Sequence, residues 1–108
     1  MAQVTFDTAS VRDWQSFHDV SMRTFGFPDF YGRNMNAWID CLTYLDEGDG
    51  MSSFILGPDE LLHIHVPDFA IFAARLPDVS SAFLDCVAFA NQRYVEREGT
   101  SRLSLVLQ

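Results

Sequence analysis

The sequence contains no lysine, and its seven arginines stand against fifteen aspartate and glutamate residues, which gives a formal net charge of −8. Proteins that bind nucleic acids hold the phosphate backbone with clustered lysine and arginine side chains. The shortage of cations therefore argues against a nucleic-acid partner. The excess of carboxylates favours a basic protein as partner, because opposite charges speed association. The alternative is that the acidity serves only solubility.

Long apolar runs are also absent, and none approaches the ~20 residues that a membrane helix needs. The N-terminus, MAQVTFD, lacks the basic and then apolar pattern of a secretory signal, so we expect a cytoplasmic protein without membrane contact. A chain of 108 residues leaves room for one domain, residues 1–108. Hydrophobic residues make up 48% of the chain, which is enough for a folded core.

Cysteine is scarce and catalytic signatures are missing. Cys41 and Cys86 lie far apart without the CxxC spacing of a zinc site, and we predict that both are buried free thiols. The chain has no Gly-rich phosphate loop and no serine elbow, which argues against an enzyme. His63 and His65 project to one face of a predicted strand and could share a metal, or they could line a half-polar sheet face.

Apolar periodicity predicts the element order β, α, α, β, α, α, β. Strands are predicted at Gln3–Asp7, Leu61–Val66 and Arg102–Leu107. Helices are predicted from an N-cap at Ser10 to Thr24, from near Asn34, from Pro67 to Leu76, and from Pro77 to Gly99, with a loop at Asp46–Glu60. Strands joined by helical connections can pair in parallel. The expected fold class is α/β, with a small three-stranded parallel sheet and about four helices.

Helical wheels separate the buried and exposed faces of these helices. The first helix should bury Val11, Trp14, Phe17, Met22 and Phe25, with His18 among them as a structural histidine. The second should bury Met35, Trp38, Cys41, Leu42 and Leu45 and present Asn36, Asp40, Thr43, Tyr44 and Glu47 to solvent. The last helix should bury Val79, Phe83, Cys86, Val87 and Ala90.

The second helix and the loops around it have the composition of a binding surface. Carboxylates cluster at and after the expected helix end, where the helix dipole disfavours them: Asp46, Glu47 and Asp49. Large side chains lie at or beyond the edge of the buried stripe: Phe30, Ile39 and Tyr44. An acidic patch with aromatic anchors suits a basic cleft on another protein. The alternative is an ordinary solvated helix face whose aromatic side chains tuck under the following loop.

The segment FPDFYGRNMNAWIDCLT, residues 27–43, resembles the barstar family of intracellular ribonuclease inhibitors. In that family a proline, an acidic residue, two aromatic residues and a glycine precede an asparagine and a helix that carries Asp-Cys-Leu-Thr. Here the matching residues, in the same order and spacing, are Pro28, Asp29, Phe30, Tyr31, Gly32, Asn34 and Asp40–Thr43. The match extends back to His18, and the predicted element order agrees with the family over nearly the whole chain.

The resemblance implies that this helix and the loop before it enter a ribonuclease active site and place carboxylates where the substrate phosphate would lie. Asp40 matches the family's principal acidic contact. The chain departs from the family where Phe30 and Asn36 replace a contacting tyrosine and aspartate, and where Tyr94 falls at the last acidic contact. The residues expected to bind the partner are Phe30, Asn36, Ile39, Asp40, Thr43, Tyr44 and Glu47.

The predicted function is a non-enzymatic inhibitor or immunity protein, in other words an antitoxin, directed at a basic ribonuclease or nuclease toxin. We expect no cofactor and no bound metal, and a monomer when the partner is absent. The alternative is a regulatory module of the same fold that binds a protein other than a nuclease. Partner identity separates the two, and a fold can carry the same surface patch to different targets.

Overall fold

The computed structural model describes residues 2–29, 31–45, 56–57 and 60–108. These residues form a parallel sheet of three strands in the spatial order β1-β2-β3: β1 (Ala2–Thr5), β2 (Leu62–Val66) and β3 (Leu103–Leu107). The helices are α1 (Trp14–Phe25), α2 (Met35–Thr43), α3 (Phe69–Arg75) and α4 (Pro77–Glu98), with a short 3-10 helix at Thr8–Ser10. The predicted α/β class, the parallel sheet and the order of the elements are confirmed.

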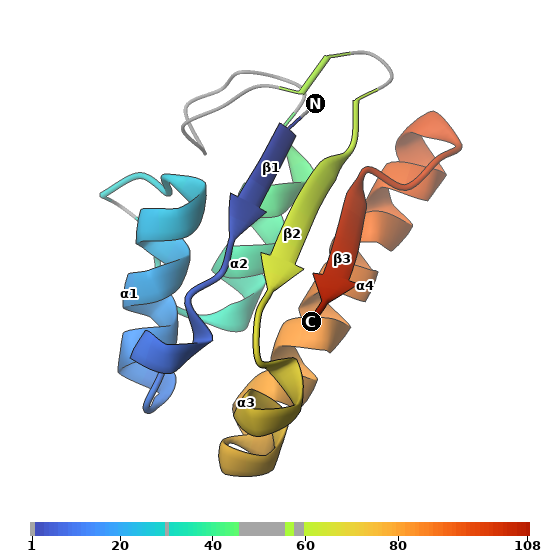
Figure 1. The fold of residues 1–108 in the computed structure, drawn as a ribbon. Coiled ribbons are helices and arrows are strands. Elements are labelled where there is room, and N and C mark those ends of the chain that lie inside the picture. Colours follow the sequence, from blue (N-terminus) through green and yellow to red (C-terminus); the bar gives the residue numbers. More distant parts are fainter. Residues whose placement is uncertain (1, 30, 46–55, 58–59) are drawn as a thin grey trace.

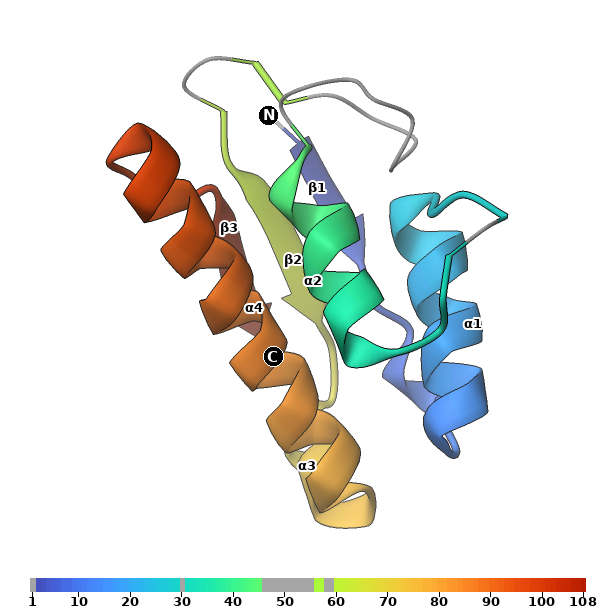
Figure 2. The same cartoon turned by 180° about the vertical axis from the view of Figure 1, so that it is seen from behind.

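The sheet is covered by helices on one face. Helices α1, α2 and α4 lie on that face, and α3 follows the end of β2 (Figures 1 and 2). The register places Ile64 of β2 between Val4 and Leu105, so the apolar side chains of neighbouring strands share a face. His63, the residue before Ile64, pairs with Gln3 of β1 and Ser104 of β3, and its side chain lies on the opposite face of the sheet. In β2 the buried side chains alternate with partly exposed ones, and the helices pack on the face that carries the buried side chains.

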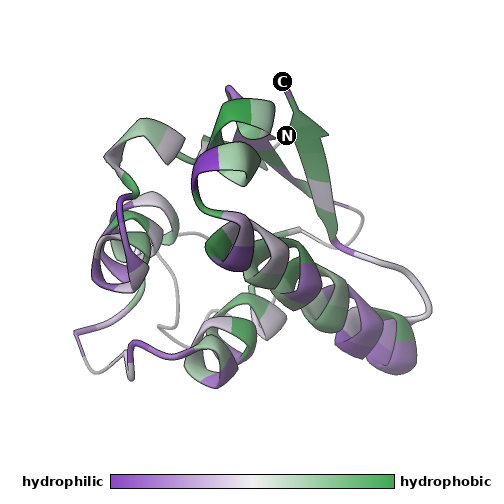
Figure 3. Cartoon of the chain, turned by 90° about the horizontal axis from the view of Figure 1, so that it is seen from below, coloured by the Kyte–Doolittle hydropathy of each residue, from purple (hydrophilic) through white to green (hydrophobic). Residues whose placement is uncertain are grey.

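Aromatic rings fill the space between the sheet and the helices. Phe6 follows β1 and stacks on Phe83 of α4, with ring centroids 4.9 Å apart. Phe17 of α1 stacks on Trp38 of α2 at 6.4 Å, which joins these two helices through the core. The apolar stripe predicted for the last helix is buried, and the C-terminal turns of α4 are hydrophilic (Figure 3).

Both cysteines are buried free thiols, as predicted. Burial, aided by the nearby charge of Asp85, raises the pKa of the Cys86 thiol to about 11. The thiol therefore stays protonated near neutral pH and behaves as a small apolar side chain of the core.

The start of α1 differs from the prediction. Asp13, not Ser10, is the N-cap: its carboxylate accepts a hydrogen bond from the Ser16 N–H at 2.8 Å, and the Ser16 hydroxyl accepts one from the Asp13 N–H at 3.0 Å. Ser10 instead ends the 3-10 helix and donates to Asp7. Trp14 was predicted to be buried but is 43% exposed. As the first residue of α1 its side chain leans toward the open N-terminal end of the helix.

Two smaller differences concern packing. Met22 and Met35 were predicted to be buried, and they lie partly exposed at the margin of the core. Arg102, predicted as the start of the last strand, precedes β3 and is 2% exposed. Its guanidinium donates to the Glu60 carbonyl at 2.9 Å and to the Glu98 carboxylate at 3.2 Å, so its burial is compensated by hydrogen bonds. Arg102 thereby ties the chain before β2 to the end of α4.

Helix α4 also fixes the C-terminal end of α2. The Tyr94 hydroxyl donates to the Leu42 carbonyl at 2.6 Å and accepts from the Leu45 N–H at 3.0 Å, and Tyr94 is fully buried. Arg97 adds a hydrogen bond to the Thr43 carbonyl at 2.9 Å. The backbone groups at the end of a helix lack partners within the helix, and these side chains of α4 supply hydrogen bonds to them.

Removing the Tyr94 hydroxyl should therefore destabilise the fold. We expect Tyr94→Phe to lower the free energy of unfolding by about 1–3 kcal/mol, because two buried backbone groups lose a partner. Urea denaturation monitored by circular dichroism measures this change. Tyr44→Phe removes the same atom from a half-buried tyrosine and should change stability by less than about 0.5 kcal/mol. Equal effects of the two substitutions would contradict this role for Tyr94.

Candidate functional site

The candidate site is built on α2, whose start matches the prediction. Asn34 is the N-cap, and its side-chain oxygen accepts a hydrogen bond from the Ala37 N–H at 2.8 Å. Arg33, immediately before it, adopts a left-handed backbone with φ of +53°. The Arg33 guanidinium forms an ion pair with Asp19 at 2.7 Å and donates to the Gln15 carbonyl. The turn that leads into α2 is thus tied to the side of α1.

A buried histidine of α1, His18, contacts the same turn through Tyr31. His18 Nδ1 lies 2.6 Å from the Tyr31 hydroxyl, and both side chains are buried. Burial lowers the pKa of His18, and the nearby Arg33 charge lowers it further. Burial likewise raises the pKa of the Tyr31 hydroxyl. The neutral pair anchors the turn to α1, which agrees with the structural role predicted for His18.

The structure brings some of the predicted binding residues to the surface of α2 and buries others. Asn36 and Asp40 are exposed, and Tyr44 is partly exposed. Thr43 was predicted to face solvent but is 2% exposed, with its hydroxyl donating to the Ile39 carbonyl. Ile39, predicted at the edge of the buried stripe, is 8% exposed. Packing of α4 along the flank of α2 covers positions that a wheel of α2 alone leaves open.

The remaining predicted positions fall outside the described residues. These are Phe30 and Glu47, together with the neighbouring carboxylates Asp46 and Asp49. The predicted loop also falls mostly outside, although Leu56 near its end is buried and its N–H donates to the Leu45 carbonyl at 2.8 Å. Tyr94, which the resemblance placed at an acidic contact, belongs to the core and takes no part in the surface.

Asp40 is engaged by α4. Arg93 Nη1 lies 2.6 Å from Asp40 Oδ1, and the two side chains are 48% and 53% exposed. The pair is therefore accessible to solvent and to a partner. Sequence analysis missed Arg93, because nothing in the local pattern shows which arginine of a later helix faces Asp40.

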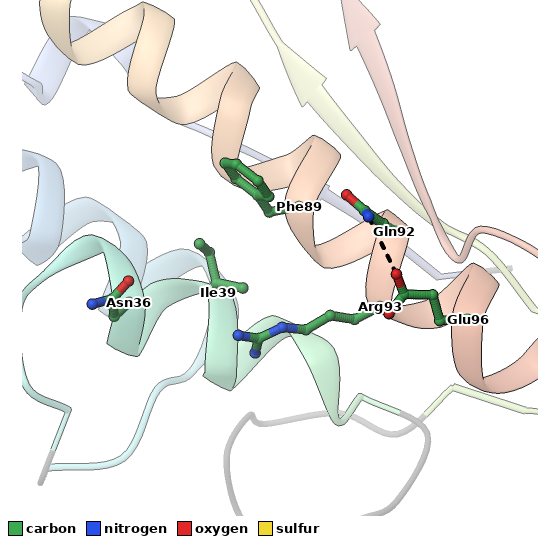
Figure 4. A pocket seen from close by; sticks show the side chains of 6 residues that line it. All are labelled: Asn36, Ile39, Phe89, Gln92, Arg93 and Glu96. Atoms are coloured by element: carbon green, nitrogen blue, oxygen red, sulfur yellow. Dashed lines mark hydrogen bonds between the residues drawn. The ribbon is translucent and has the colours of Figure 1, made fainter.

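A groove runs between α2 and α4 beside this ion pair (Figure 4). It measures about 380 Å³, and its lining residues are Asn36, Ile39, Phe89, Gln92, Arg93 and Glu96. Phe89 is 56% exposed and was not predicted as a surface residue. Its position off the buried stripe of α4 predicts exposure, but a single exposed phenylalanine does not by itself indicate a binding surface.

The histidines of β2 lie on the helix-free face of the sheet. His65 Nε2 lies 3.1 Å from the Gln3 side-chain oxygen, which favours the reading in which they line a half-polar face. Within the described ranges, no group of three or more His, Cys, Asp or Glu side chains is placed to hold a metal ion.

The buried His18 makes stability depend on pH. Its pKa in the folded protein is below the ordinary 6.5, so the unfolded chain takes up a proton first as the pH falls. The contribution of His18 to stability is therefore fully present above about pH 6.5 and decreases as the pH falls from there toward the folded pKa. We expect His18→Gln to reduce this pH dependence, measured by urea denaturation at about pH 7.5 and 5.5.

His63→Gln is the matched control, because it removes a half-exposed histidine with the same substitution. Any change that the two variants share then reflects the loss of a histidine and not the buried position of His18. A His18→Gln variant whose stability falls as steeply as that of the control would argue against the buried neutral pair.

Comparison with known proteins places the chain in a family. The sequence model of the family described as "Barstar (barnase inhibitor)" matches residues 1–106. No curated protein sequence matches the chain. Across the residues the structure describes, no helix is both long and apolar enough to cross a bilayer. The chain belongs to the barstar family, whose members are inhibitors and not enzymes.

Proposed function

We propose that this barstar-family chain inhibits a barnase-type ribonuclease by inserting the exposed face of α2, with Asp40 at its centre, into the enzyme's active site. Family membership implies a ribonuclease of this type as partner. A ribonuclease must bind the phosphates of RNA, so its active site carries cationic groups. A carboxylate on a rigid helix can satisfy those groups and exclude the substrate.

The observation that carries the proposal is the placement of Asp40. Its side chain is 53% exposed, and it lies on a helix whose two ends are fixed by buried or capping contacts. Such a helix loses little conformational entropy on binding, because its backbone is already ordered. A carboxylate presented in this way makes charge-assisted hydrogen bonds to arginine or histidine without rearrangement of the backbone.

Neighbouring side chains extend the proposed contact. Asn36 is exposed one helical turn before Asp40, and Tyr44 is partly exposed one turn after it. Ile39 lines the groove between α2 and α4 and adds apolar surface to the proposed contact. Phe30 and Glu47 remain predictions from the sequence. In this arrangement the chain acts in the cytoplasm as an antitoxin or immunity protein that neutralises the nuclease.

Inhibition of barnase tests the proposal directly. We expect Asp40→Ala to weaken inhibition of RNA cleavage by about 30-fold or more, because the enzyme's cations would be buried without an anion, a loss of about 2–5 kcal/mol. Asp7→Ala is the matched control, because Asp7 is 52% exposed and also forms an ion pair with an arginine, Arg23.

The thermal midpoint of both variants should stay close to that of the unmodified protein, because exposed ion pairs contribute little to stability. Unchanged inhibition by the Asp40→Ala variant would place the inhibitory surface elsewhere. A protein that binds a partner without inhibiting any ribonuclease would favour the regulatory module of the same fold.

The net charge of −8 generates a second expectation, which concerns the rate of association. The field of an acidic inhibitor attracts a basic enzyme over distances that salt shortens to ~10 Å at 0.1 M. We expect the association rate constant with barnase, measured by stopped-flow fluorescence, to fall steeply as sodium chloride is added, while the dissociation rate changes less. An association rate that is independent of salt would remove electrostatic steering from the mechanism.

A further inference from the structure

The carboxylate proposed to receive the enzyme's cations is already bound to a cation of the same chain. Arg93 reaches from α4 toward α2 (Figure 4) and donates to Asp40 Oδ1 at 2.6 Å. Among the described residues, Asp40 is the only hydrogen-bonding partner that the structure gives the Arg93 side chain. The contact therefore occupies the group that the partner needs.

Among the described residues, the charges around this pair balance locally, although the chain as a whole is strongly acidic. A hollow beside the groove is lined by two acidic residues, two arginines and two uncharged residues: Asp40, Glu96, Arg93, Arg97, Thr43 and Tyr44. Arg97 is held by the Thr43 carbonyl at 2.9 Å and lies over the Tyr94 ring at 5.0 Å. Arg93 has no comparable packing contact in the described part of the chain, so it is the cation that can move away.

We propose that Arg93 competes with the partner's cations for Asp40 and so sets how strong a contact with this carboxylate must be before it adds to affinity. This inference rests on the proposed function, because it concerns the same carboxylate. A single exposed ion pair is weak, so a cleft in which two or more cations converge on one carboxylate displaces Arg93. A surface that offers one isolated lysine only exchanges one exposed ion pair for another, so its contact with Asp40 adds little net affinity. Because every partner must break the same pair, Arg93 lowers all affinities by one factor, and only a cleft that binds Asp40 more strongly than one exposed ion pair gains from this contact.

Two exposed ion pairs of the protein, Arg93–Asp40 and Arg23–Asp7, make the inference testable. Arg93→Gln frees Asp40, while Arg23→Gln makes the same change of charge at the ion pair with Asp7. With purified barnase, we expect Arg93→Gln to raise the association constant by roughly two- to fivefold, the worth of one exposed ion pair. Arg23→Gln should give only the smaller increase due to the change in net charge. In an Asp40→Asn background Arg93→Gln should give only the small increase due to the change in net charge.

A second probe does not depend on ribonuclease binding. A tetra-arginine peptide can be titrated at low salt into each isotopically labelled variant and followed through the amide signal of Asp40 by nuclear magnetic resonance. We expect the peptide to bind the Arg93→Gln variant more tightly at this signal than the Arg23→Gln variant.

The two probes separate the possible failures. If the unmodified protein does not inhibit barnase, the proposed function fails for that enzyme, and the peptide titration alone decides the role of Arg93. If inhibition is observed but Arg93→Gln binds barnase no better than Arg23→Gln, the proposed function stands and the competition is wrong. Equal peptide binding by the two variants would also overturn it.

Discussion

The contact between the Tyr94 hydroxyl and the end of α2 is the constraint on which the proposed binding surface depends. It fixes α2 against α4, and that packing buries Ile39 and Thr43 while leaving Asp40 at the surface. The same packing places Arg93 within hydrogen-bonding distance of Asp40. The packing of α2 on α4, which the Tyr94 hydroxyl supports, therefore sets which side chains of α2 are exposed and places a positive charge beside Asp40.

Electrostatics acts on two length scales in this protein. The net charge of −8 creates a field that extends from the whole surface and brings a basic partner close. At contact distance among the described residues, the charge of Asp40 is balanced by that of Arg93. The net charge of the chain and the charge at Asp40 are therefore two separate quantities.

The sequence predicted the fold well because its strands and helices have distinct apolar spacings. The start of α2 near Asn34 was predicted from the turn before it, whereas the Asp13 cap was missed because Ser10 offered a plausible earlier start. The burial of Ile39 and Thr43 could not be predicted, because it depends on a helix far along the chain. The Asp40–Arg93 pair joins residues 53 positions apart, a separation over which no local pattern carries information.

The two ends of α2 are held by Asn34 and Tyr94, and neither residue belongs to the exposed face between them. Substitution at Asn36 or Asp40 therefore leaves the scaffold almost untouched, because exposed positions contribute little to stability. Selection can exchange the residues of this face one at a time while the protein continues to fold. Changes in this face can then follow changes in a partner while the framework stays stable, and each new pairing is reached through folded intermediates.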